Sequence, residues 1–169
     1  VLTAAHCVLP GADYKLVEFD AAHQPTLKDI AGITRHPKFD VNAVLRHSVT
    51  ADVALLKLAA LVKNPPALLA PADSSVAVGD RLIIAGYGLA TLGDGKSGGS
   101  VRMATLVATG QPGTLQIRLF DPSTRGERPG LGACTGDSGA PAFREVNGWL
   151  MVIGVVSWAL GAANTGGCG

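Results

Sequence analysis

Charged side chains are scarce in this sequence: Asp, Glu, Lys and Arg together account for 16% of the 169 residues, and the formal net charge is +1. There is no run of Lys or Arg that could follow a phosphate backbone, so we do not expect nucleic acid as a partner. Aromatic residues are also few, at 5%, but 47% of the residues are hydrophobic. That share is sufficient for the core of one globular domain of ordinary size.

Long hydrophobic runs are missing as well. The longest apolar stretch covers residues 149–160 and is interrupted by Gly154 and Ser157. It falls short of the ~20 residues that a helix needs to span a bilayer. We interpret this stretch as a buried strand and expect no contact with a membrane.

Cysteine is limited to three residues, Cys7, Cys134 and Cys168, which are too few for a disulfide-rich scaffold. None of the spacings between them is the CxxC spacing of a zinc site, so we expect no bound metal.

Glycine and proline, by contrast, are well represented, with 22 and 10 residues that separate short runs rich in Val, Ile and Leu. This spacing is typical of an all-β barrel or sandwich. We expect a short helical turn at residues 2–6, no helix of three turns, and an exposed flexible loop at residues 93–100, while residues 74–78 stay ambiguous. Strands are predicted at residues 51–58, 81–85, 101–108, 114–120 and 149–158.

Three short motifs contain residues of catalytic type: TAAHC contains His6, ADVALLKL contains Asp52, and CTGDSGAP contains Ser138. A Ser hydroxyl is a weak nucleophile at neutral pH, and an imidazole with a pKa of about 6.5 can take and return its proton. A buried carboxylate can hold that imidazole in one tautomer, and the apolar neighbours of Asp52 predict its burial. Taken singly, the motifs are more typical of a structural His, a capping Asp and an ordinary turn. Their combination favours a Ser nucleophile with a His base.

The order His, Asp, Ser, with separations of 46 and 86 residues, resembles the chymotrypsin/trypsin family of serine endopeptidases. AGYG at residues 85–88 resembles the Gly-Trp-Gly turn of that family, and SWA at residues 157–159 resembles the strand that pairs with substrate. Tyr87 and Trp158 are expected to be packing residues, and Trp158 also to line the substrate cleft. The resemblance implies an all-β fold of two six-stranded antiparallel β-barrels. It also implies peptide-bond hydrolysis through an acyl-enzyme without a cofactor, and secretion as a zymogen.

The chain begins directly on VLTAAHC and stops just after Cys168, so both ends are expected to be cut. The resemblance then implies a partial domain that lacks N-terminal strands and the C-terminal strand and helix. Residues 1 to about 70 would be the remainder of the first barrel, and about 71–169 most of the second. The resemblance also implies a disulfide between Cys134 and Cys168, and a partner for Cys7 upstream of Val1.

The resemblance assigns further roles around Ser138. The backbone N–H groups of Gly136 and Ser138 would form the oxyanion hole, and Gly136 suits a loop that needs positive φ. Asp137 would receive the ammonium group of a new N-terminus after activation cleavage. Ser157 would hydrogen-bond the buried Asp52.

Substrate preference is inferred from the position two residues before Cys134, where Gly132 stands in place of the Asp of trypsin-like members. A basic side chain would lack its buried counter-charge there, and Ala159 narrows the pocket wall. We therefore predict apolar residues of small to medium size before the scissile bond. The candidate substrate-binding residues are Gly132, Ala133, Thr135, Ser157, Trp158 and Ala159.

Two alternatives stay open: a non-catalytic binding protein of the same fold, and a fragment that is inactive although the full-length enzyme works. The first is disfavoured because the three residues of the triad and Gly136 are all present. An esterase or lipase is disfavoured because that class has GxSxG with the His last. Expected partners are protein or peptide substrates, and protein inhibitors of proteases are further candidates. The remaining histidines, expected at the solvated surface without a role, are His23, His36 and His47.

Overall fold

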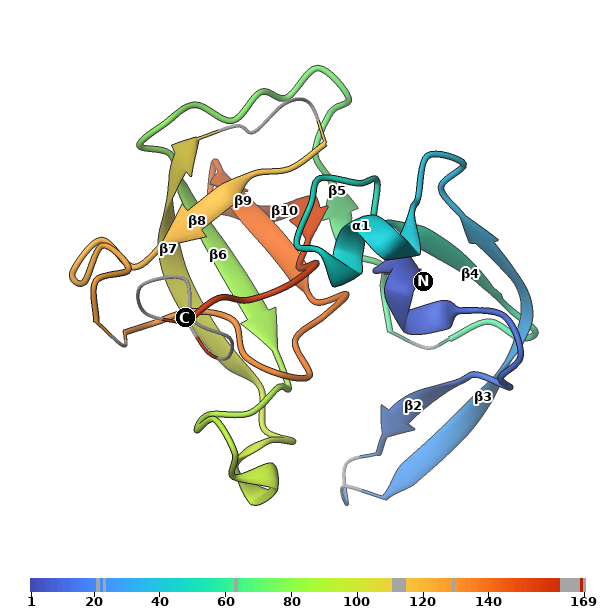
Figure 1. Cartoon of the computed structure of the whole chain (residues 1–169). Coiled ribbons are helices and arrows are strands. Elements are labelled where there is room, and N and C mark those ends of the chain that lie inside the picture. Colours follow the sequence, from blue (N-terminus) through green and yellow to red (C-terminus); the bar gives the residue numbers. More distant parts are fainter. Residues whose placement is uncertain are drawn as a thin grey trace.

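The computed structural model contains two β-sheets that stand next to each other, with little helix (Figure 1). The only α-helix among the described residues is α1 (Val41–Leu45), and two short 3-10 turns are η1 (Ala5–Val8) and η2 (Gly95–Ser97). The all-β prediction is therefore confirmed. The structure describes residues 1–20, 22, 24–62, 64–110, 115–128, 130–161 and 168.

The first sheet has four strands and lies in the N-terminal part of the chain. They are β1 (Leu2–Thr3), β2 (Lys15–Phe19), β3 (Pro25–Arg35) and β4 (Ala54–Leu58), in the order β1-β4-β3-β2. All neighbouring strands are antiparallel. The long strand β3 pairs with β2 through its first half and with β4 through its second, so it connects the hairpin to the rest of the sheet.

The second sheet has six strands in the order β5-β10-β9-β6-β7-β8. All neighbours are antiparallel except β5, which pairs parallel to β10. The hairpin between β9 and β10 turns at Asn147 and Gly148, with φ of 53° and 79°. Two positive φ angles are what a tight type I′ hairpin needs. The strands are β5 (Leu68–Leu69), β6 (Arg81–Gly86), β7 (Arg102–Gly110), β8 (Arg118–Phe120), β9 (Pro141–Val146) and β10 (Trp149–Val155).

Several predicted bounds need correction. The strand predicted at 51–58 begins only at Ala54, because tight backbone turns run from Thr50 to Val53. The helical turn predicted at 2–6 is a strand, Leu2–Thr3, followed by a 3-10 turn from Ala5 to Val8. Residues 74–78, which the sequence left ambiguous, form no strand: they connect two turns, and Val76 between them is buried in the core.

The C-terminal strand also differs from its prediction. It ends at Val155, short of 158, and its residues are half-buried or exposed instead of buried. Tyr87, expected to pack, is 56% exposed. The strand predicted at 114–120 begins at Arg118, and its first residue, Thr114, lies outside the described residues.

Buried side chains of the described residues form three small clusters, one in the first half of the chain and two in the second, of which one contains Val76, Leu82 and Ala108. In the first half Ala5, Val8 and Ala54 pack together, so η1 is held against β4. In the second half Ile84 and Leu106 pack on the segments that contain Ala133 and Ala142. Among the helices of the described residues, none is both long and apolar enough to cross a membrane. None of these clusters of described residues spans both halves, and the candidate site lies where the halves meet.

Candidate active site

Asp52 is the central acceptor of the site. It lies just before β4 and is only 4% exposed. His6, on η1, approaches it twice: the ring Nδ1 lies 2.7 Å from Oδ2, and the backbone N–H donates to Oδ1 at 2.9 Å. The Ser157 hydroxyl donates to Oδ2 as the resemblance implied. Three donors therefore fix the carboxylate, and they leave Nε2 of His6 facing away from it.

These contacts set the charge of the pair. The hydrogen bond to Asp52, followed by that to the Cys7 thiol, raises the pKa of His6 to about 10 against the opposing effect of burial. Burial raises the pKa of Asp52, but hydrogen bonds from His6 and Ser157 outweigh it and hold that pKa below its usual value. Both shifts favour an imidazolium next to a carboxylate.

Ser138 lies in a turn between two glycines with positive φ, Gly136 at 94° and Gly139 at 82°. Gly139 is packed so closely on Thr3 and Ala4 that a Cβ there would collide with the Thr3 hydroxyl. Because Ala4 leads directly into η1, this packing holds the Ser138 turn against the segment that contains His6.

The Cys7 sulfur lies between His6 and Ser138. It is 3.6 Å from His6 Nε2 and 3.8 Å from the Ser138 carbonyl oxygen. The Ser138 hydroxyl donates instead to the Ser157 carbonyl, at 3.3 Å. Among the hydrogen bonds of these described residues, none joins Ser138 Oγ directly to His6 Nε2.

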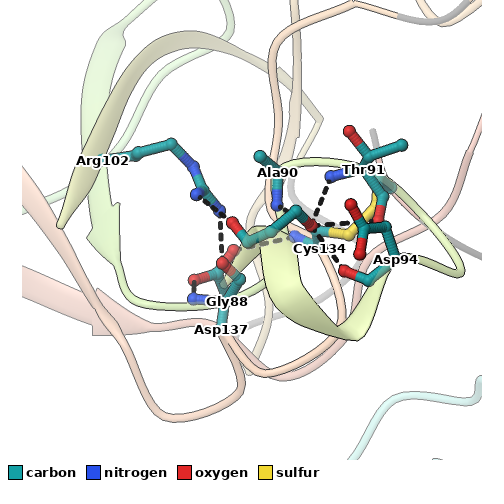
Figure 2. Close-up of a disulfide and its surroundings, with 9 residues drawn as sticks. Gly88, Ala90, Thr91, Asp94, Arg102, Cys134 and Asp137 are labelled. Carbon is teal, nitrogen blue, oxygen red and sulfur yellow. Dashed lines mark hydrogen bonds between the residues drawn. A yellow bond between two sulfur atoms is a disulfide. The ribbon is translucent and has the colours of Figure 1, made fainter. Parts of the chain in front are cut away.

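Asp137, the residue before Ser138, accepts hydrogen bonds from the backbone of two neighbouring segments (Figure 2). Its Oδ1 accepts from the Gly88 N–H at 2.7 Å, and its Oδ2 accepts from the Cys134 N–H at 2.9 Å. Arg102 donates to the Gly88 carbonyl and, at 2.9 Å, to the Ser97 carbonyl of the loop predicted to be exposed. That loop is largely exposed and includes η2. The Ser138 turn is therefore anchored to the loop after β6.

Cysteine pairing follows the expectation. Cys134 and Cys168 form a disulfide that closes a separation of 34 residues, while Cys7 is free in the structure. The disulfide joins the segment before Ser138 to the C-terminal end of the chain.

The candidate substrate-binding residues surround the same turn. Ala133 is buried, Gly132 is half-buried and Thr135 is exposed, while Trp158 and Ala159 are half-buried. Gly132, Cys134 and Asp137 line a cavity of about 220 Å³, together with residues of β6 and β7. Neither His6 nor Ser138 lines that cavity, but Asp137 and Ala140, on either side of Ser138 in the chain, do.

One neighbour of the site had no signal in the sequence. The His47 ring, which follows α1, lies 6.0 Å from the Trp158 ring, centroid to centroid. His36 and His47 are exposed as expected, and His23 lies outside the described residues. Within the described part of the chain, no three His, Cys, Asp or Glu side chains gather in a way that could hold a metal ion.

The sequence model of the trypsin family matches residues 1–169. Trypsin 5G1 of Aedes aegypti is 28% identical over 182 aligned positions, which cover 98% of this chain and 64% of the relative. The chain therefore spans slightly less than two thirds of that relative's length. Among solved structures, neuropsin, a serine protease expressed in the limbic system of mouse brain, matches with a TM-score of 0.70 at 24% identity, over 99% of this chain and 74% of neuropsin. A mutant of human heparin binding protein matches with a TM-score of 0.72 at 20% identity and the same coverage.

Proposed function

Because this chain belongs to the trypsin family, whose two-barrel fold its two sheets match, we propose that it is a serine endopeptidase that uses His6, Asp52 and Ser138. The carrying observation is the contact of a buried Asp52 with His6 Nδ1 at 2.7 Å, next to the turn that contains Ser138. This arrangement leaves His6 Nε2 free of Asp52, so it can take a proton from a hydroxyl once the imidazolium has released its own Nε2 proton.

In the proposed reaction, Ser138 Oγ attacks the peptide carbonyl carbon and its proton passes to His6 Nε2. His6 then gives that proton to the departing amine, and an acyl-enzyme ester remains on Ser138. A water molecule, deprotonated by His6, hydrolyses the ester and restores the hydroxyl. To begin, Ser138 Oγ must turn from the Ser157 carbonyl to His6 and replace the Cys7 thiol there.

The negative oxygen of the tetrahedral intermediate needs preorganised donors, and each is worth ~3 kcal/mol. The backbone N–H groups of Gly136 and Ser138 have no acceptor among the described residues. Their availability supports an oxyanion hole at this turn. Asp137 orders the turn through Gly88 and Cys134, and we propose that an ammonium group released by activation cleavage joins it there.

We propose a preference for apolar residues of small to medium size before the scissile bond. Support comes from Gly132 and Ala133, which offer no carboxylate for a basic side chain. The Cys134–Cys168 disulfide braces the same segment. The proposal extends to protein or peptide substrates, to protein inhibitors as partners, and to a secreted protein, in which a disulfide persists.

One observation favours a second candidate function. The Ser138 hydroxyl bonds the Ser157 carbonyl and not His6, which would also suit a binding protein that keeps this fold without turnover. The two candidates differ in whether Ser138 reacts.

Labelling with a fluorophosphonate decides between them. In the activated full-length protein we expect covalent label on Ser138, loss of label in Ser138→Ala and His6→Ala, and unchanged label in the exposed control Ser100→Ala. Intact-mass measurement and peptide mapping provide the readout. Equal labelling of Ser138→Ala and the parent would refute the assignment, and no labelling of the parent would favour the binding protein.

A further inference from the structure

Asp121 is a buried carboxylate that the proposed mechanism does not use. It directly follows β8 and is 7% exposed. Its Oδ1 accepts from the Ser123 N–H at 2.8 Å, and its Oδ2 accepts from the Leu131 N–H at 2.9 Å. Leu131 is ten residues further along the chain, so one side chain joins both ends of the loop that leaves β8.

The backbone carbonyl of Asp121 also holds the loop that leaves β8. Its carbonyl oxygen accepts from the N–H groups of Thr124, at 3.2 Å, and Arg125, at 2.8 Å. Gly130 is packed against Asp121 Oδ2 and the Thr124 side chain, and a Cβ there would lie 2.8 Å from Thr124 Cγ2. A side chain at this position would therefore displace the Asp121 carboxylate or the Thr124 side chain.

The returning end of this loop leads into the segment that contains the candidate substrate-binding residues Gly132 and Ala133. Leu131 and Gly132 line the 220 Å³ cavity, Ala133 packs in the core with Ile84, and Cys134 carries the disulfide. Cys134 and the core hold the far end of this segment. The hydrogen bond from Leu131 to Asp121 is what holds its near end.

We propose that Asp121 is a positioning residue for substrate recognition: by holding Leu131, it places Gly132 and Ala133 as the floor of the pocket for the residue before the scissile bond. This inference rests on the proposed function. The hydrogen bonds from the backbone amides of Leu131 and Ser123 lower the pKa of Asp121, so the acceptor remains ionised near neutral pH.

A direct contact between Asp121 and substrate is the competing interpretation. Both carboxylate oxygens are already engaged by backbone amides, and Asp121 does not line the cavity. Asp121 therefore acts through Leu131 and not as a counter-charge for a basic side chain.

The test compares Asp121→Asn and Asp121→Ala with the parent in the activated full-length protein. Asn keeps one carbonyl acceptor, whereas Ala removes both. The substrates are peptides that differ only in the residue before the scissile bond, and the fluorophosphonate labelling rate reports on Ser138 independently of that pocket. Asp13→Asn is the matched control, because the Asp13 side chain is 81% exposed.

We expect kcat/KM for the preferred apolar peptides to fall roughly tenfold in Asp121→Asn and further in Asp121→Ala, mainly through KM, because charge-assisted hydrogen bonds are lost. The ratio of kcat/KM between preferred and other peptides should fall, and the labelling rate of Ser138 should stay within about twofold of the parent. The Asp13→Asn control should match the parent in both measurements. Faster hydrogen exchange at the Leu131 amide in Asp121→Asn would show directly that the hydrogen bond from Leu131 to residue 121 is weakened.

Other outcomes would overturn the inference. Unchanged kcat/KM in both variants of an active parent would remove Asp121 from recognition but leave the proposed function intact. A loss of kcat/KM only for peptides with Arg or Lys before the scissile bond would mean that Asp121 acts as a counter-charge for a basic side chain. An equal fall in the labelling rate and in kcat/KM for every peptide would mean that Asp121 has a general structural role. A parent that neither labels nor cleaves would end the proposed function and this inference together.

Discussion

Asp52 shows how much one buried side chain can organise in this protein. Without partners, a carboxylate at this depth would be costly to ionise. Two donors from His6 and one from Ser157 make the ionised form the stable one, and the same contacts orient the imidazole. The burial of Asp52 was predictable from its apolar neighbours. The Cys7 sulfur against His6 Nε2 was not, because adjacency in the chain does not specify the direction of a side chain.

The His6–Asp52 pair should make stability depend on pH. The pKa of Asp52 is lowered in the folded protein, so its contribution is present above its usual value of about 3.8 and is lost as pH falls through the folded value. The pKa of His6 is raised to about 10, so its contribution is complete below about 6.5 and is lost as pH rises toward 10. The stability difference between the parent and Asp52→Asn should therefore be largest from about pH 4 to 6.5.

Thermal unfolding of both proteins across pH 3 to 10 measures this difference. A difference that does not vary with pH would contradict the coupling of the two groups, and Asp13→Asn, an exposed carboxylate, is the control.

At the level of secondary-structure elements, the long apolar strands were predictable, and most strands of mixed sequence were not. β6 and β7 were predicted to within two residues at each end, because their runs of Ile, Leu, Val and Ala are typical of buried strands. β2 and β3 were missed because charged residues interrupt their apolar residues, as at Lys15, which pairs with Asp29 across the hairpin. Their pairing comes from contacts across the hairpin, not from a hydrophobic run.

The turn after β6 offers a test at the element scale. A Cβ on Gly88 would lie 2.6 Å from Asp137 Cγ and 2.8 Å from its backbone nitrogen. Gly88→Ala should therefore displace Asp137 and cost ~1–3 kcal/mol of stability, as overpacking typically does. Fluorophosphonate labelling of Ser138 should slow with it, because Asp137 positions that turn.

Gly95→Ala is the matched control for this change, since nothing lies within 4 Å of a Cβ at Gly95. Urea unfolding and labelling rates provide the measurements. If Gly88→Ala behaved like Gly95→Ala in both, the close contact with Asp137 would have no energetic role.

At the scale of the whole molecule, several contacts between the two halves belong to the site. Ser157 reaches Asp52, Cys7 reaches the Ser138 carbonyl, and Gly139 packs on Thr3. The site therefore exists only when both sheets are formed and joined. Loss of packing between the halves should remove the site before it removes either sheet.

The Cys134–Cys168 disulfide should stabilise this assembly. Its separation of 34 residues corresponds to ~4 kcal/mol in the chain-entropy account of disulfides. The Cys134→Ser, Cys168→Ser double variant should lower the free energy of unfolding by about that amount in urea titrations. Addition of a reductant should destabilise the parent but not the double variant. Equal stability of parent and double variant would show that this bridge does not constrain the unfolded chain.

The sequence by itself determined the all-β class and the family, and it singled out His6, Asp52 and Ser138 as the candidate catalytic residues. Those conclusions depend on residue type, order and local pattern, which a single chain displays directly. Only the tertiary structure decided that the Ser138 hydroxyl donates to the Ser157 carbonyl, that Gly88 donates to Asp137 and accepts from Arg102, and that Asp121 accepts from the Leu131 amide. The physical reason is that each of these contacts is a hydrogen bond between groups that folding brings together. The type of a polar residue does not predict which group it will bond.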